Sequence, residues 1–314
     1  MNILLLGANG QVGHELREPL ARLGRVACAS RTGTLDDAGS CTSVDLADSE
    51  ALLRVLETNK PDVIVNAAAY TAVDRAEDEP DLADRINHLA VAEIAGWAAR
   101  NEARVVHYST DYVFDGSDPK PRQEDDPTGP LGAYGRSKLA GEAALRASGA
   151  RHLILRTAWV YAARGQNFLR TMLRLGAERE ELRIVDDQIG SPTPARWIAG
   201  ATVHILQRLE RMKEQERALA LGTYHLTASQ RCSWFEFAAA IFEAARQRGL
   251  LQRIPRLLPI ASSDYPTRAT RPAFSVLDNA RLALVFGLQL PPWREGLREV
   301  IGELADAHPI GETR

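Results

Sequence analysis

A tyrosine and a lysine stand four residues apart in the string Tyr134-Gly-Arg-Ser-Lys138. On a helix this spacing places both side chains on one face. A ketone reductase needs a proton donor beside the carbonyl oxygen, and a nearby ammonium lowers the pKa of a phenol by favouring its ionised form. We therefore predict that Tyr134 donates the proton and that Lys138 tunes it and hydrogen-bonds the ribose of a nicotinamide cofactor.

The scarcity of lysine strengthens this interpretation. The chain has 38 lysines and arginines, of which only Lys60, Lys120, Lys138 and Lys213 are lysines, which leaves 34 arginines. A compact ammonium at position 138 differs from the planar guanidinium used nearly everywhere else. A helical Tyr–Lys pair with a purely structural role stays open as the alternative.

A glycine-rich turn, Gly7-Ala8-Asn9-Gly10-Gln11-Val12-Gly13, precedes these residues. It follows an apolar run of strand length and opens a segment with helical spacing of apolar residues. Glycines let backbone N–H groups approach a pyrophosphate at a helix N-terminus. We predict that Gly7, Gly10, Gln11, Val12 and Gly13 bind a dinucleotide; an ordinary turn between strand and helix is the alternative.

The end of the second expected strand indicates which dinucleotide is bound. The string Ala29-Ser30-Arg31-Thr32 has no carboxylate before Asp36. An acid at this point favours NAD, whereas a basic residue accommodates the 2′-phosphate of NADP. We predict that Ser30 and Arg31 hold this phosphate and that NADPH is preferred, with NADH as a second cofactor. An arginine in a surface turn is the alternative.

Residues after the next two strands complete the predicted cofactor site. Asp45 and Leu46 are expected to border the adenine. Ala67, Ala68 and Ala69 follow an apolar strand, and small side chains there leave room for a ligand in the crevice. Tight packing is the other reading of these alanines.

Short apolar runs alternate with helical segments through the first half of the chain. Strands are expected at residues 2–6, 25–29, 43–45, 62–66, 104–109 and 152–157, with helices at 11–23, 81–100 and 133–148. This alternation predicts an α/β fold, a Rossmann-type doubly wound parallel sheet. We expect residues 1–160 to form the NADP-binding domain. Residues 161–314, which mix helices with Pro-rich breaks, should form mainly a smaller, interleaved substrate-binding lobe. The charged run 208–217 is interpreted as a solvated helical face.

Composition excludes several classes of protein. The 314 residues carry a formal net charge of −3 and are 45% hydrophobic, so nothing indicates binding to nucleic acid or an anionic membrane. No apolar run is long enough to span a bilayer, and the N-terminus has the pattern of a strand rather than a signal peptide. Cys28, Cys41 and Cys232 show no paired spacing, which favours a cytoplasmic location.

Together these motifs resemble the extended short-chain dehydrogenase/reductases and, among them, the dTDP-4-dehydrorhamnose reductases. The similar strings are Gly10–Gly13, Asn66-Ala-Ala-Ala-Tyr-Thr-Ala-Val-Asp74, Ser109-Thr-Asp-Tyr-Val-Phe114, Tyr134–Lys138, Arg156-Thr-Ala-Trp-Val-Tyr161 and Asp187-Gln-Ile-Gly-Ser-Pro-Thr193. They run nearly end to end. The resemblance implies reduction of dTDP-4-dehydro-6-deoxy-L-mannose to dTDP-L-rhamnose with NADPH or NADH.

The resemblance also implies roles for single residues. Thr110 would hydrogen-bond the sugar near the reacting oxygen, and Asp111 would help to bind the sugar. Trp159 would border the substrate, and Arg271 would contact the nucleotide diphosphate, which suits a guanidinium fork. From the residues alone, Trp159 could equally be a core residue and Arg271 a member of a surface ion pair.

One feature departs from the family. Some members are metal-bridged dimers that use glutamates at two positions; Glu15 fits the first, but the second is Arg196, which is no ligand for Mg²⁺. A shared magnesium site is therefore not expected, and a monomer and a homodimer both remain open. Hydride transfer to a carbonyl needs no metal if Tyr134 supplies the acid.

The motifs bear on four rival functions. A 4,6-dehydratase of this fold has Asp-Glu after its active-site threonine, whereas Tyr112 follows Thr110-Asp111 here. An epimerase retains NAD, which the basic string at Arg31 does not favour. A reductase of another nucleotide-linked keto-sugar, or a non-catalytic NADP-binding regulatory subunit, stays open as the alternative.

Overall fold

A computed structural model describes residues 1–37 and 39–307. Its centre is a parallel sheet in the order β3-β2-β1-β4-β5-β6-β11. The strands are β1 (Asn2–Leu6), β2 (Arg25–Ser30), β3 (Thr42–Ser43), β4 (Val63–Asn66), β5 (Arg104–Thr110), β6 (Arg151–Thr157) and β11 (Gly222–His225). The order 3-2-1-4-5-6 is that of doubly wound dinucleotide-binding sheets. The predicted fold class is confirmed.

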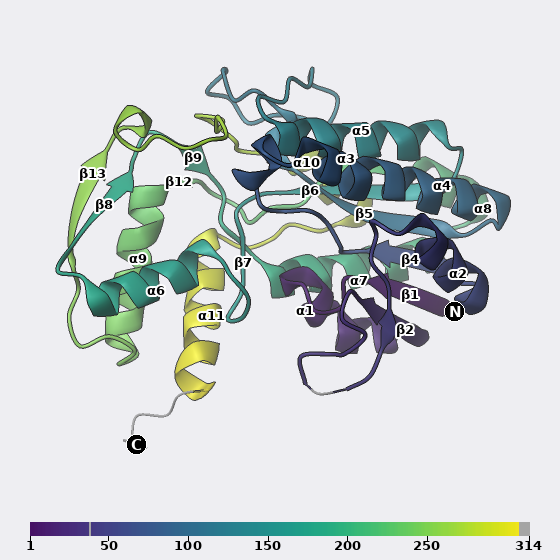
Figure 1. Cartoon of the computed structure of the whole chain (residues 1–314), viewed down its shortest axis with the longest axis horizontal. Coiled ribbons are helices and arrows are strands. Elements are labelled where there is room, and N and C mark those ends of the chain that lie inside the picture. The colour runs from purple at the N-terminus through teal and green to yellow at the C-terminus, as the bar shows by residue number, and fades with distance from the viewer. Residues whose placement is uncertain (38, 308–314) are drawn as a thin grey trace.

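Helices cover both faces of the sheet, as Figure 1 shows. The helices α1 (Gln11–Ala21), α7 (Ala195–Arg211) and α10 (Ala280–Phe286) pack on one face; α2 (Ser49–Asn59), α4 (Ala90–Arg100) and α5 (Ala133–Ala147) pack on the other. Along β1, Leu5 belongs to the first apolar core and its neighbours Leu4 and Leu6 to the second. Burial on both faces explains why these strands are nearly continuous apolar runs.

Several element boundaries differ from expectation. The helix expected at 81–100 begins as α3 (Pro80–Asp84) and passes through one π-helical turn, Arg85–Leu89, before α4. The first helix ends at Ala21, before Leu23. The helix α2 was not predicted, although Asp48 caps it by accepting a hydrogen bond from the Ala51 N–H.

The interpretation of residues 208–217 as one helical face was wrong. The helix α7 ends at Arg211, and a separate helix, α8 (Glu214–Leu219), follows. The Arg217 side chain turns back and donates to the carbonyl oxygens of Leu209 and Met212. A cation at the end of a helix satisfies carbonyls that have no partner within it, so this arginine stabilises the break.

A third apolar core lies at the left of Figure 1. It is built from α6 (Phe168–Glu178), α9 (Trp234–Gln247), α11 (Trp293–Ala307) and the parallel pair β8 (Glu181–Val185) and β13 (Arg256–Ile260). Two-residue ladders, β7 (Val160–Tyr161) with β10 (Thr193–Pro194) and β9 (Ile189–Gly190) with β12 (Cys232–Ser233), join it to the central sheet. The chain returns to that sheet at β11, so the two units are interleaved in sequence.

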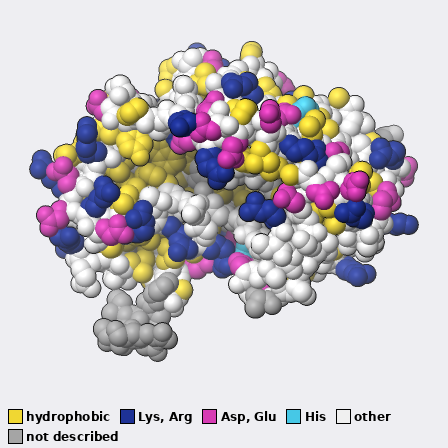
Figure 2. All heavy atoms as spheres, viewed as in Figure 1, with side chains coloured by type: hydrophobic (Ala, Val, Ile, Leu, Met, Phe, Trp, Pro, Cys, Tyr) yellow, Lys and Arg dark blue, Asp and Glu magenta, His cyan; other side chains and the backbone are white. Residues whose placement is uncertain are grey.

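Charges of both signs are interspersed over the face drawn in Figure 2, which is hollowed between these two units. Within the described residues, no helix combines the length and the apolar character needed to cross a membrane.

Candidate active site

One large cleft opens along the carboxyl ends of the central strands, where the chain order of the sheet reverses between β1 and β4. Its volume of about 1490 Å³ exceeds that of a pocket for one small ligand, so a dinucleotide and a second ligand fit together. Nearly all predicted site residues line it: Gly7, Gly10, Gln11, Val12, Ser30, Arg31, Asp45, Leu46, Ala67, Ala68, Ala69, Thr110, Asp111, Tyr134, Lys138, Trp159 and Arg271. Gly13 and Glu15 lie outside this lining.

The glycine turn between β1 and α1 forms one end of the cleft. Gly7 has a φ of +79°, and a Cβ there would come within 2.6 Å of the Ala68 nitrogen. A Cβ at Gly13 would overlap the Gly7 carbonyl, so this glycine allows α1 to pack closely rather than touching a ligand. Gly10 caps α1, whose N-terminus faces the cleft at Gln11. This cradle of backbone N–H groups fits a pyrophosphate.

The end of β2 presents a cation without a carboxylate partner. Within residues 1–37 and 39–307, the Arg31 side chain makes no hydrogen bond or ion pair, and it is exposed on the cleft. Asp36, the first acid after the strand, accepts hydrogen bonds from Arg17 and Arg164. It is therefore already neutralised. The Ser30 hydroxyl donates to the Thr34 carbonyl, so it orders the turn that presents Arg31.

Tyr134 lies in the first turn of α5, and its phenol lies near the Thr110 side chain at the end of β5. The close approach depends on Gly135, because a Cβ there would overlap the Tyr112 carbonyl. The Thr110 hydroxyl also donates to the Asp111 carboxylate at 2.9 Å. The packing of α5 on β5 thus brings the predicted acid close to Thr110.

Burial, rather than Lys138, has the largest effect on the pKa of Tyr134 in this arrangement. Burial raises the pKa of Tyr134 to about 12, the Thr110 side chain has a lowering effect on it, and the Asp111 charge raises it. Lys138 makes no hydrogen bond to the phenol within the described residues. Its amine donates to the Tyr108 carbonyl at 2.6 Å and lies 3.3 Å from Nε2 of His107. Burial lowers the pKa of Lys138 to about 8, against a raising effect of Glu142.

A buried ion pair fixes α5 to the sheet. Glu142, one turn beyond Lys138, receives two hydrogen bonds from Arg156 of β6, at 2.9 and 2.7 Å. Burial would raise the pKa of the Glu142 carboxyl, but the hydrogen bonds and charge of Arg156 hold it below its usual value. The pair therefore stays ionised, and Tyr134, Lys138 and Glu142 lie on one face of a firmly held helix.

The far side of the cleft is aromatic. Trp159, at the end of β6, stacks on Trp234, the first residue of α9. Both rings line the cleft with Phe168. Sequence analysis assigned no role to Trp234, Phe168 or Gln188, which also line it. Trp234 lies 75 positions after Trp159, so no local pattern could have joined them; Gln188 stands in a string that only the resemblance singled out.

Polar groups aimed at the cleft complete the site. Asp111 is buried, and its Oδ2 has no hydrogen-bond partner among the described residues. Burial raises the pKa of Asp111 to about 6, against hydrogen bonds from Ser275 and Thr110. Arg271 is paired with Asp74 at 2.8 Å, while its Nη1 is buried without a partner in the described part of the chain. Arg271 is thus both an ion-pair member and a donor toward the cleft.

Nothing at the second position of the family's metal site resembles a ligand. Arg196 is paired with Glu303 of α11. Within residues 1–37 and 39–307, no three His, Cys, Asp or Glu side chains are grouped to hold a metal.

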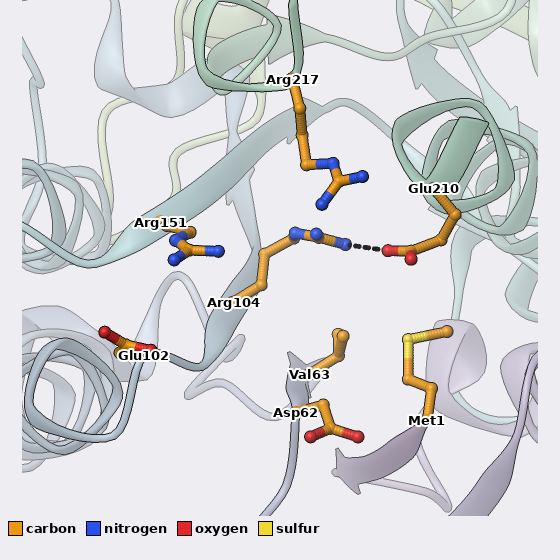
Figure 3. Close-up of a pocket in the computed structure, with 8 residues that line it drawn as sticks. All are labelled: Met1, Asp62, Val63, Glu102, Arg104, Arg151, Glu210 and Arg217. Carbon is orange, nitrogen blue, oxygen red and sulfur yellow. Dashed lines mark hydrogen bonds and ion pairs between the residues drawn. The ribbon is translucent and has the colours of Figure 1, made fainter. Parts of the chain in front are cut away.

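A smaller hollow lies at the opposite edge of the sheet, among the residues that begin its strands (Figure 3). Arg104 and Arg217 point toward its centre, and Arg104 is paired with Glu210 at 2.9 Å. Asp62 and Glu102 also line it. Cations and carboxylates offset each other there, and neither a tyrosine nor a glycine turn is present, so the chemistry belongs to the carboxyl edge.

Comparison with known proteins agrees with this placement. The chain matches the family model of the RmlD substrate binding domain over residues 1–306. A relative described as dTDP-4-dehydrorhamnose reductase, from Burkholderia thailandensis, is 49% identical over 94% of this chain and 96% of its own length. The crystal structure of a dTDP-4-dehydrorhamnose reductase from Clostridium acetobutylicum superposes with a TM-score of 0.85, at 35% identity, over 97% of this chain and 99% of that one.

A third relative was solved with a cofactor. The dTDP-4-dehydrorhamnose reductase of Bacillus anthracis, in complex with NADP, has a TM-score of 0.82 at 34% identity and covers 96% of this chain and 98% of its own. These matches span both the sheet and the C-terminal unit. The chain belongs to the dTDP-4-dehydrorhamnose reductase family.

Proposed function

We propose that this chain reduces the C4 ketone of dTDP-4-dehydro-6-deoxy-L-mannose to give dTDP-L-rhamnose, with NADPH as the preferred reductant and NADH as a second one. The observation that carries the proposal is the meeting of Tyr134 and Thr110 at the end of β5, between the glycine turn and the aromatic wall. A partly buried phenol beside an open cleft is the proton donor that carbonyl reduction requires.

The residues present fit the dinucleotide. The turn at Gly7 and Gly10 offers backbone N–H groups at the start of α1, and Arg31 supplies an unpaired cation for a 2′-phosphate. Asp45, Leu46 and the alanines 67–69 would border the adenosine and the middle of the cofactor. When bound, the reduced nicotinamide supplies the hydride that adds to C4.

Tyr134 would then act as the acid. With a pKa raised to about 12 by burial, the phenol is protonated near neutral pH and can give its proton to the C4 oxygen. The hydroxyl of Thr110 would hydrogen-bond the same oxygen, and Lys138 in its ammonium form would stabilise the phenolate left behind.

The opposite wall would hold the sugar nucleotide. Trp159 offers an apolar ring to one face of the deoxysugar. The unpartnered Oδ2 of Asp111 would accept a sugar hydroxyl, and the free Nη1 of Arg271 would donate to the diphosphate. We assign cofactor binding to residues 1–160 and substrate binding mainly to residues 161–314, with Asp111 and Trp159 of the first part completing the substrate site.

Two broader features belong to the same proposal. We infer that the enzyme works in the cytoplasm, since its cysteines are unpaired, as a monomer or homodimer without nucleic acid partners. Magnesium has no part in the proposed step, because Tyr134 supplies the acid; Glu15 remains the residue to vary if metal dependence is observed.

The test is stoichiometric turnover. Purified protein is mixed with NADPH and the keto-sugar nucleotide, and absorbance of the reduced nicotinamide is followed alongside product formation. One NADPH oxidised per dTDP-L-rhamnose formed supports the proposal. Cofactor binding without oxidation would point to a different keto-sugar or a regulatory subunit.

A further inference from the structure

Beneath Lys138 lies a histidine whose two ring nitrogens both face nitrogen atoms. His107 of β5 is fully buried. Its Nδ1 is 3.3 Å from Nδ2 of Asn66, and its Nε2 is 3.3 Å from Nζ of Lys138. An amide nitrogen only donates, and so does an ammonium, whereas a neutral imidazole has one donor and one acceptor. The side chains of Asn66, His107 and Lys138 form a row, and the proton positions along this row are therefore constrained.

The constraint starts at the backbone of Ala68. Its N–H donates to Oδ1 of Asn66 at 3.2 Å, which fixes the amide so that its NH₂ group faces the ring. Nδ1 of His107 must then accept, and the single imidazole proton lies on Nε2. Burial holds the pKa of His107 well below its usual value, and an ammonium at Lys138 would lower it further, so the ring is neutral.

The Nε2–H group points at the Lys138 amine. That amine already donates one hydrogen to the Tyr108 carbonyl, and only a neutral amine has a lone pair with which to accept from Nε2–H. An ammonium would need the proton moved to Nδ1 and the Asn66 amide turned over. Turning it would break the hydrogen bond to Ala68.

We propose that His107 is a positioning residue whose tautomer, set by Asn66 and Ala68, couples the charge of Lys138 to the end of strand β4. In the free enzyme the row favours a neutral Lys138. Ala68 lines the cofactor cleft, so changes in its backbone hydrogen bond reach the lysine through two side chains. The consequence for turnover rests on the proposed reductase function; the tautomer itself does not.

The other groups around Lys138 do not set its charge, so this row does. On α5, Tyr134 is an un-ionised phenol. Glu142 accepts hydrogen bonds from Arg156 of β6 and from Arg146, so its charge is already paired. From the segment 80–100, the side chain packed against α5 near Lys138 is the uncharged Asn87, which donates to Ser137. With the pKa of Lys138 lowered to about 8 by burial, a single hydrogen bond is enough to decide its charge near neutral pH.

The direct test is the tautomer of His107 by ¹⁵N NMR of histidine-labelled protein, which needs no turnover. The His107 signals are identified by their loss in His107→Gln, or in His107→Asn if the first variant does not fold. The proposal predicts protonated Nε2 and bare Nδ1 at neutral pH. In Asn66→Asp, a carboxylate can accept from both Ala68 N–H and Nδ1–H, so the proton should move to Nδ1. A wild-type ring protonated on Nδ1 overturns the proposal.

The second test is the alkaline limb of kcat/KM for reduction, which needs the ammonium form of Lys138. A glutamine at 107 can turn its oxygen toward an ammonium, and aspartate at 66 makes Nε2 an acceptor. Both variants should move the limb upward by about one pH unit. The control is His152→Gln, at a partly buried histidine that faces the Ala150 carbonyl outside the cleft, and it should leave the limb in place.

A lower kcat with an unmoved limb in folded His107→Gln would show a merely structural role and contradict the proposal. The tautomer result stands apart from the reductase assignment. Absence of any turnover in wild-type protein would count against the proposed function alone, while the NMR result would still decide the role of His107.

Discussion

The indole of Trp159 lies flat against that of Trp234, with ring centroids 3.4 Å apart and planes inclined by 4°. Trp159 has a φ of +48°, a left-handed conformation that is rare for a bulky residue. Such strain persists only where surrounding structure holds it. Gly190 supplies the space, since a Cβ there would overlap the Trp159 ring.

Gly190→Ala should therefore displace the Trp159 ring, which we propose borders the substrate. We expect KM for the sugar nucleotide to rise by about tenfold or more, because misplaced positioning groups are costly, while the Kd for NADPH is unchanged. Gly200→Ala is the control: it lies in α7 with no atom within 4 Å of its added Cβ. Equal KM values for the two variants would mean that Trp159 is a core residue only.

Arg31→Ala should weaken NADPH binding selectively. A hydrogen bond to a charged group contributes about 1.5–3 kcal/mol, so KM for NADPH should rise by roughly 10- to 100-fold and KM for NADH should barely change. Arg22→Ala, an exposed pair with Glu18 on the same side of the sheet, is a matched loss of charge. Equal effects of Arg31→Ala on both cofactors would refute the 2′-phosphate assignment.

Glu142→Gln should destabilise the fold strongly. It leaves Arg156 buried without its carboxylate, and breaking a buried pair on one side costs about 3–5 kcal/mol. Glu50→Gln removes an exposed pair with Arg54 and should cost at most about 1 kcal/mol. Urea unfolding of both variants measures the difference; similar midpoints would show that the buried pair is not needed to hold α5.

His225 should make the protein sensitive to acid. Burial and the charge of Arg156 lower the pKa of His225 from 6.5 to about 3. Between pH 6.5 and 3 the unfolded chain binds a proton that the folded chain does not, so the free energy of unfolding falls as pH falls through this range. His225→Gln should flatten that decline in urea titrations at several pH values. A decline as steep as in the wild type would show that His225 does not contribute.

The fold and the pair of Tyr134 and Lys138 could be predicted from the sequence because they depend on local patterns of residues. Four-residue spacing puts Tyr134 and Lys138 on one helical face, and strand ends of a parallel sheet meet at one edge, which brings Thr110 and Gly7 to the same cleft. These relations need no knowledge of distant packing.

The remainder depends on contacts that spacing does not encode. Trp234 meets Trp159 only through the packing of a separate unit, and the pairing of Asp36 with Arg164 joins residues 128 positions apart. The pKa of Tyr134 could not be predicted because burial, which dominates it, follows from the fold as a whole. His107 gave a signal that could have been used, since a histidine within a strand expected to be covered on both faces must find partners.

The most direct test of the central claim is Tyr134→Phe under single-turnover conditions, with NADPH binding measured in parallel. The phenylalanine keeps the ring and removes only the acidic hydroxyl. We predict that the rate of reduction falls by about 10²- to 10⁴-fold while the Kd for NADPH stays within about twofold. A reduction rate close to that of the wild type would remove Tyr134 as the proton donor and contradict the account.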